Sequence, residues 1–92
     1  MTKAEQLWKG VVSEMGCIIC GDEAELHHPR EGVGMGQRAS DFLVIPLCPL
    51  HHRLGTQFHA PSVHGAPQHF RAKYGSEMEL LGRVNQHMAG LL

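Results

Sequence analysis

Two pairs of cysteine and histidine residues have the spacing of metal-binding knuckles. Cys17 and Cys20 are separated by two residues, and Cys48 and His51 repeat that spacing further along the chain. A gap of two lets both side chains of a pair turn toward one ion, and four soft ligands of this kind suit tetrahedral zinc. Free cysteines that pack as small apolar side chains are the alternative. Because two matched pairs occur in one short chain, the pattern favours a structural zinc site.

The histidines of the chain include two doublets, His27–His28 and His51–His52. Adjacent residues of a helix diverge by about 100°, so His52 should point away from the zinc site that His51 completes. On a strand, His27 and His28 would face opposite sides. One member of each doublet is therefore expected at a second site, whereas surface or capping histidines are the alternative for His27 and His28.

The apolar pattern predicts which elements carry these residues. A helix is expected over residues 2–16, because Thr2 and Glu5 form a capping box and Gly16 can end the helix. Two strands are expected at 23–29 and 42–48, joined by a glycine-rich loop over 30–41. Pro46 confines the second strand to an edge or to its own end. The first helix should bury one face made of Ala4, Leu7, Trp8, Val11, Val12 and Met15.

The second half of the chain reads as a broken helical pattern. One short helix is expected to begin near His51 and to give way to a loop with Gly55, Pro61 and Gly65. Two further helices are expected over 67–75 and 76–92, the last with a Ser76–Glu79 capping box. Its buried stripe should consist of Leu80, Leu81, Val84, Met88 and Leu91.

Composition narrows the class of protein. The chain has 92 residues, which predicts one small domain spanning residues 1–92. Because large aromatic side chains are few, a metal or a partner chain is expected to help stabilise it. Its formal charge of −1 gives no bulk electrostatic argument for nucleic acid, so any phosphate contact must be local. Three cysteines cannot all pair internally, and no signal peptide or membrane span is evident. A reduced cytoplasmic setting, a metal site and no membrane partner are therefore expected.

Three motifs together resemble a known family of nucleases. The segments "CIIC", "LHHPR" and "LVIPLCPLHH" look like the zinc-containing branch of the HNH, or ββα-metal, endonucleases. The segments "GMGQRASDFLVIPLCPLHH", "VHG" and "FRAKYGSEMELL" are similar to small phage and prophage proteins related to the recombination-enhancement (Ref) nucleases. The resemblance runs from Cys17 to about Leu81. It implies an α+β fold, namely a small ββα-metal core with a structural zinc site, flanked by an N-terminal helix and C-terminal helices.

The resemblance also implies roles for the histidines. His28 would be the general base, grouped with Arg30 at the catalytic centre, and His27 and His52 would hold a second, catalytic divalent ion. A further ligand is needed, for which His64 in "VHG" is the first choice and His59 the competitor. Histidine ligands favour zinc, nickel, cobalt or manganese by softness, whereas the family often uses magnesium or manganese.

One position departs from the family pattern. Leu43 occupies the spacing at which the middle asparagine of the HNH motif commonly lies. The neighbouring Asp41 is the expected substitute for fixing the loop.

The arginines near these histidines are expected to contact DNA. Arg30 and Arg38 flank the glycine-rich loop, whose backbone amides can approach phosphates closely, and Arg53 follows His52. The implied function is a metal-dependent DNA endonuclease or nickase of phage or prophage origin, acting in recombination in the bacterial cytoplasm. Its implied partners are DNA and a RecA-type recombinase filament. A non-catalytic zinc module that binds nucleic acid or protein is the alternative, and a metal carrier or sensor is a third hypothesis.

Overall fold

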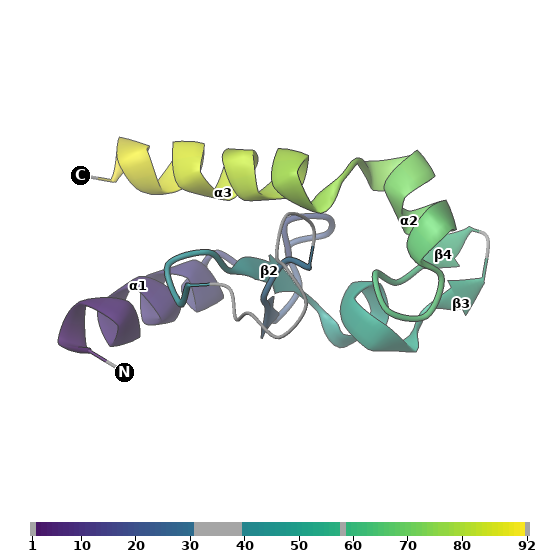
Figure 1. Cartoon of the computed structure of the whole chain (residues 1–92). Helices are drawn as coiled ribbons and strands as arrows, with labels where there is room; N and C mark the ends of the chain where they lie inside the picture. The colour runs from purple at the N-terminus through teal and green to yellow at the C-terminus, as the bar shows by residue number, and fades with distance from the viewer. Residues whose placement is uncertain (1, 31–39, 58, 92) are drawn as a thin grey trace.

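The computed structural model describes residues 2–30, 40–57 and 59–91. It has the mixture of helices and short antiparallel sheets that the α+β prediction requires, and that prediction is confirmed (Figure 1). None of the helices in the described ranges is both long and apolar enough to cross a membrane. The elements are, in order, α1 (Lys3–Glu14), β1 (Glu25–His27), β2 (Ile45–Leu47), the helical turn η1 (Leu50–Leu54), β3 (Thr56–Gln57), β4 (Ala60–Pro61), α2 (Pro67–Tyr74) and α3 (Glu77–Gly90).

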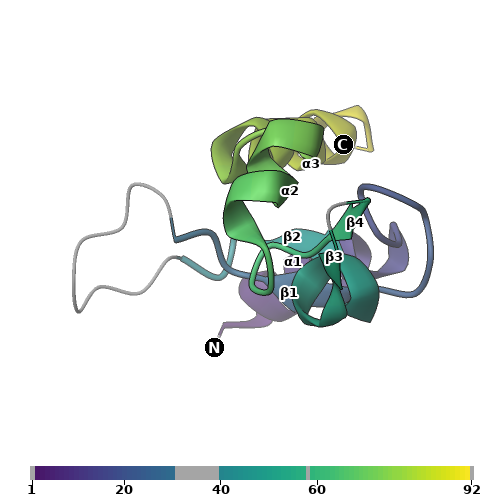
Figure 2. The same cartoon turned by 90° about the vertical axis from the view of Figure 1, so that its right-hand side faces the viewer.

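The antiparallel pair of β1 and β2 lies in the middle of the molecule. Its register places Glu25 opposite Leu47 and His27 opposite Ile45. Helices α1 and α3 both contact β2, and Figure 1 shows them on either side of it. The turn η1, the β3–β4 hairpin and α2 gather at the other end, away from the start of α1 and the end of α3 (Figures 1 and 2). The knuckle residues therefore flank the central strands.

Two adjoining apolar clusters hold the elements together. The larger one joins β2 to α2 and α3 and includes Cys17 and Cys48, so two of the predicted zinc ligands are part of the core. Its buried members are Cys17, Ile45, Leu47, Cys48, Phe70, Leu80 and Leu81. The smaller cluster joins α1 to α3 and consists of Val12, Val44, Val84 and Met88, with Trp8 packed against it.

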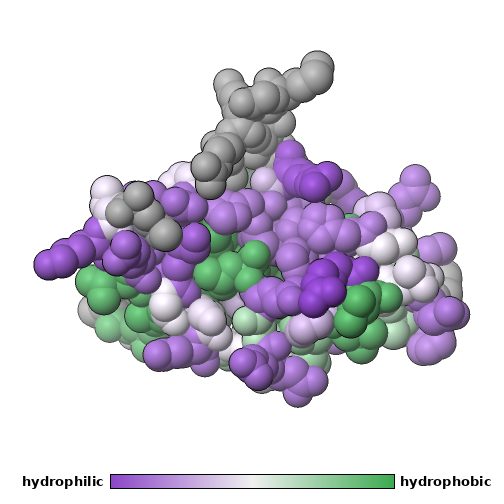
Figure 3. All heavy atoms as spheres, turned by 90° about the horizontal axis from the view of Figure 1, so that it is seen from below, coloured by the Kyte–Doolittle hydropathy of each residue, from purple (hydrophilic) through white to green (hydrophobic). Residues whose placement is uncertain are grey.

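The predicted start of α1 is confirmed, but its predicted buried face is too wide. Thr2 and Glu5 form the reciprocal capping box, and the helix ends at Glu14. Val12 is fully buried, whereas Leu7 is 70% exposed and Val11 37% exposed. Helix α1 meets the small cluster along a narrow line, so part of its apolar stripe remains on the surface. Figure 3 shows such apolar patches among hydrophilic side chains.

The strands are shorter than the pattern predicts. β1 and β2 have three residues each, within the expected segments 23–29 and 42–48. Pro46 lies in the middle of β2, opposite Leu26, and its carbonyl accepts a hydrogen bond from the backbone N–H of Ile18 at 2.9 Å. Among the described residues this sheet has two strands, so both are edges, and an edge tolerates the missing N–H of proline.

The last helix also follows its prediction in part. Ser76 and Glu79 form the expected capping box, and Leu80, Leu81, Val84 and Met88 are buried. Leu91, predicted to complete the stripe, is instead 58% exposed because it follows the last turn of α3 and passes beyond the small cluster.

Candidate metal centres

Two groups of side chains in the described part of the chain have the geometry to hold a metal ion. The first contains Cys17, Cys20, Cys48 and His51, whose ligand atoms all lie within 4.8 Å of one another. Nδ1 of His51 is 3.2 Å from Sγ of Cys48, and the sulfur atoms of Cys20 and Cys48 are 3.7 Å apart. Three thiols and one imidazole are a zinc-binding set.

Backbone turns bring the two knuckles of this group together. Gly16 adopts φ +79°, and a side chain there would lie 2.6 Å from the carbonyl oxygen of Gly21, so glycine is required at the entry to the first knuckle. The N–H of Cys17 donates to the carbonyl of Asp22 at 2.8 Å, which closes that turn. The second knuckle runs from the end of β2 into η1, which places His51 at the first group.

The second group consists of His27, His52 and His64, also with ligand atoms within 4.8 Å. We refer to it as the three-histidine group. The ring centroids of His27 and His52 are 5.2 Å apart, and those of His52 and His64 are 4.8 Å apart. His27 is buried and His64 is exposed, so the group opens to solvent on one side. His51 and His52 therefore belong to different groups, as their divergence on a helical turn suggests.

The β3–β4 hairpin determines that His64, rather than His59, joins this group. After the hairpin, the backbone N–H of His64 donates to the carbonyl of His52 at 3.1 Å, and that of Val63 to the carbonyl of His51 at 2.9 Å. The buried hydroxyl of Ser62 fixes this return by donating to the carbonyl of Gly55 at 2.6 Å. His59 lies in the connection between β3 and β4, where its carbonyl accepts a hydrogen bond from Lys73.

Carboxylates hold two of the three imidazoles. Nε2 of His27 lies 2.9 Å from Oε2 of Glu77, and Nδ1 of His52 lies 2.7 Å from Oε1 of Glu25. An imidazole beside a carboxylate acceptor donates its proton, so the other ring nitrogen keeps its lone pair. Glu25 also accepts two hydrogen bonds at Oε2 from Arg53, at 3.2 and 2.9 Å.

His28 lies outside the three-histidine group and has its own carboxylate. Its Nε2 atom is 3.0 Å from Oδ1 of Asp41, and its side chain is 36% exposed. Asp41 also lies 3.7 Å from Nζ of Lys9 on α1. The two members of the first doublet thus separate, with His27 buried in the group and His28 facing outward beside Asp41.

Burial keeps most of these imidazoles neutral. It lowers the pKa of His27, although Glu77 acts in the opposite direction, and it lowers the pKa of His64, assisted by the neighbouring His52 and Arg30. Burial also lowers the pKa of His51. Neutral imidazole is the form that binds metals, so the residues present fit a divalent ion at pH 7.

The thiols hold their protons unequally. Burial acts to raise the pKa of Cys17, but backbone N–H groups of Cys48, Cys20 and Ile19 outweigh it, and the pKa is lowered. Desolvation and hydrogen bonding with Cys48 and Cys17 raise the pKa of Cys20 to about 12. An ion entering this group must therefore displace protons, which is the behaviour of structural zinc sites.

The predicted DNA-contacting arginines differ in their surroundings. Arg53 is engaged with Glu25, whereas Arg30 is exposed and its backbone N–H donates to Glu77 at 2.8 Å. Arg38, with Gly32, Gly34 and Gly36, lies outside the described residues. Sequence reasoning missed Glu25 and Glu77. Glu25 lies two positions before His27 on β1 and carried a weak signal, whereas Glu77 lies 50 positions away and carried none.

Comparison with known proteins gives two matches. A family model described as recombination enhancement, RecA-dependent nuclease, matches residues 2–89. The uncharacterized protein YdfU of Escherichia coli (strain K12) is 37% identical over 75 residues, which cover 78% of this chain and 19% of that protein. The chain therefore spans about a fifth of the length of this relative.

Proposed function

The chain belongs to the family of RecA-dependent nucleases of recombination enhancement, and we propose that it is a metal-dependent DNA endonuclease or nickase of the HNH type. The observation that carries this proposal is the division of the two histidine doublets. His51 joins the thiols, His27 and His52 join the three-histidine group, and His28 remains outside both. A zinc module without activity would need only the first of these arrangements.

The two groups would have different tasks. The group of Cys17, Cys20, Cys48 and His51 would hold structural zinc between the central strands and η1. The three-histidine group would hold a second divalent ion, for which zinc, manganese, nickel and magnesium are the candidates. Such an ion, when bound, would supply positive charge that stabilises the negative charge developing in the transition state.

The remaining steps would be carried out by side chains of this chain. His28 would accept a proton from a water molecule, and the resulting hydroxide would attack phosphorus while the bond to the 3′-oxygen breaks. The departing 3′-oxygen would take a proton from solvent water. Asp41 would hold the His28 ring by accepting from Nε2, which leaves Nδ1 for the water proton. Arg30, exposed near His64, would contact a non-bridging phosphate oxygen. The formal net charge of −1 predicts weak, salt-sensitive affinity for DNA.

The partner in the proposal is DNA bound to a RecA-type recombinase filament. The family description supports this partner, and the chain's charge of −1 agrees with delivery by a partner rather than independent attraction to DNA. Cleavage should accordingly be faster on DNA joined to a filament than on free duplex.

A plasmid-nicking assay with the filament present tests the proposed base. Replacing His28 with alanine should lower the cleavage rate by about 10²–10⁴-fold, the usual contribution of a general base, while zinc content and helicity stay unchanged. His87→Ala provides the matched control, because His87 is an exposed histidine on α3.

Two results would count against the proposal. Unchanged nicking by His28→Ala would remove the assigned base. Absence of cleavage by the unaltered protein on every DNA form, with manganese, nickel, zinc or magnesium supplied, would favour a non-catalytic zinc module that binds nucleic acid or protein.

A further inference from the structure

Glu77, the first residue of α3, touches both the three-histidine group and the chain just beyond β1. Its Oε2 atom accepts one hydrogen bond from Nε2 of His27 at 2.9 Å and another from the backbone N–H of Arg30 at 2.8 Å. The side chain of His27 is 3% exposed and that of Glu77 is 14% exposed. A carboxylate bond shielded from water in this way is stronger and more directional than one at the open surface.

This contact decides which nitrogen of His27 is available. Because Nε2 donates its proton to Glu77, the imidazole carries its lone pair on Nδ1. Removing the carboxylate would let the ring exchange tautomers and turn about its side-chain bonds. The backbone bond to Arg30 adds a second constraint, because it holds the chain three residues beyond His27 against the same oxygen.

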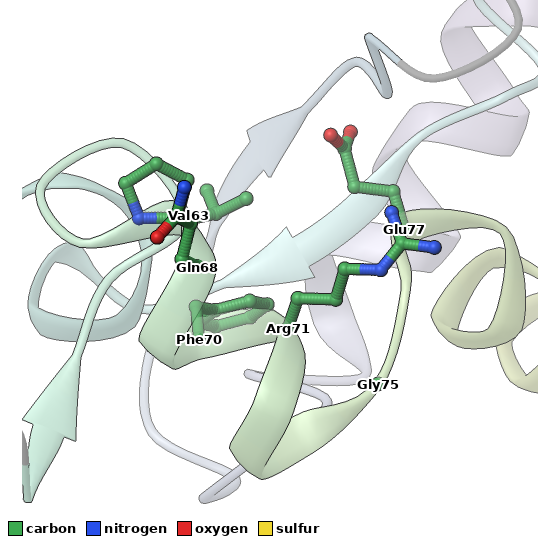
Figure 4. A pocket seen from close by; sticks show the side chains of 7 residues that line it. Val63, Gln68, Phe70, Arg71, Gly75 and Glu77 are labelled. Atoms are coloured by element: carbon green, nitrogen blue, oxygen red, sulfur yellow. The ribbon is translucent and has the colours of Figure 1, made fainter.

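A side chain of α2 lies beside Glu77 as well. Figure 4 shows Arg71 of α2 extending toward Glu77 along one wall of a pocket of about 230 Å³. Phe70 and Val63 contribute apolar surface to that pocket, and Val63 directly precedes His64. The carboxylate therefore lies among α2, α3 and the end of β1.

We infer that Glu77 is a positioning residue for the second ion, fixing the tautomer and orientation of His27. The inference rests on the ion site of the proposed function, and it gives α3 a role in that site. Carboxylates that accept from the outer nitrogen of a ligating histidine raise its basicity and fix its ring, and their loss commonly costs about 10–100-fold in metal affinity.

Titration of cobalt into the zinc-loaded protein, followed by calorimetry, tests this role. Glu77→Ala should weaken binding at the second site by about 10–100-fold. Glu77→Gln should weaken it less, because an amide oxygen can still accept the imidazole proton. Glu79→Gln is the matched control, because it removes the same charge from the first turn of α3. The Glu79 side chain accepts a hydrogen bond from the backbone N–H of Ser76 instead of from a histidine. Its cobalt affinity should equal that of the unaltered protein.

The absorption spectrum of bound cobalt separates positioning from direct ligation. A positioning role leaves the ligand-field bands of Glu77→Gln in place while affinity falls, and the structural zinc remains bound. A changed band pattern would make Glu77 a ligand and overturn the inference. Unaltered affinity in Glu77→Ala, with DNA cleavage intact in the parent protein, would overturn the inference alone. A parent protein that takes up no second ion would overturn both this role and the proposed ion site.

Discussion

At the scale of single residues, three of the four histidines in the doublets bond a carboxylate. His51 is the exception, since its Nδ1 atom faces sulfur and its Nε2 atom lies 3.5 Å from the hydroxyl of Tyr74. Each carboxylate accepts a hydrogen bond from one ring nitrogen, and the other ring nitrogen keeps its lone pair. The carboxylate pairs are His27–Glu77, His28–Asp41 and His52–Glu25.

Glu25 gives a testable consequence of this pairing. Hydrogen bonds from Arg53, and secondarily from His52, lower its pKa from 4.5 to about 2. Arg53→Ala should move the carboxyl titration upward, toward the ordinary value, as followed by carbon NMR of that side chain. Arg83→Ala is the matched control, because Arg83 donates to the carbonyl of Ile18 instead. A Glu25 that titrates at its ordinary value in the unaltered protein would contradict the observed pairing.

The sign of the effect on stability follows from the lowered pKa. Glu25 contributes stability above its unfolded-state pKa, and this contribution is lost as the pH falls from about 4.5 toward about 2. In Arg53→Ala the contribution should be smaller, so its midpoint of acid unfolding should lie at higher pH.

At the scale of elements, the junction between α1 and the first knuckle depends on Gly16. Its φ of +79° and the close carbonyl of Gly21 predict that Gly16→Ala lowers the free energy of unfolding by about 1–3 kcal/mol. Gly10→Ala is the contrasting variant: no atom lies within 4 Å of a side chain built there, and alanine should stabilise the interior of α1 by about 0.5–1 kcal/mol. Urea unfolding of the two variants should therefore shift in opposite directions. Equal shifts would contradict the geometry of the turn.

Local features of the elements could be predicted from sequence, whereas their burial could not. Both capping boxes and the glycine after α1 depend on residues a few positions apart, and all three are found. The burial of Leu7 and Leu91 depends on how far other elements extend, and both are exposed. At one end of the sheet, pairing stops at Glu25 and Leu47, where the chain joins the knuckles, and alternation of side chains does not reveal this.

At the scale of the whole molecule, the group of Cys17, Cys20, Cys48 and His51 links the larger apolar cluster to the first knuckle. Cys20 is exposed, so truncating it removes little packing, and an exposed substitution normally changes stability by less than about 0.5 kcal/mol. As a zinc ligand, however, Cys20→Ala should strip the ion and unfold the domain, because metal binding is coupled to folding. Leu54→Ala, at a residue 59% exposed, should leave thermal unfolding nearly unchanged.

Circular dichroism and zinc content of Cys20→Ala and Leu54→Ala test whether Cys20 is a zinc ligand on which folding depends. Cys20→Ala protein that keeps its helicity and its melting temperature would show that the thiols pack without an ion.

The candidate metal ligands were predictable to different degrees. The spacing within each knuckle suffices to nominate Cys17, Cys20, Cys48 and His51, because ligand pairs of this type are local. Choosing His64 over His59 required the β3–β4 hairpin, which reverses the chain beside η1. The carboxylate partners required the tertiary fold, since Glu25 lies 27 positions from His52 and Glu77 lies 50 positions from His27.

Native mass spectrometry of the metal-loaded protein tests the separation of the two groups most directly. We expect two divalent ions per chain in the unaltered protein, one ion after His64→Ala, and still two after His59→Ala. One ion per chain in the unaltered protein, or the loss of an ion from His59→Ala but not from His64→Ala, would contradict the account.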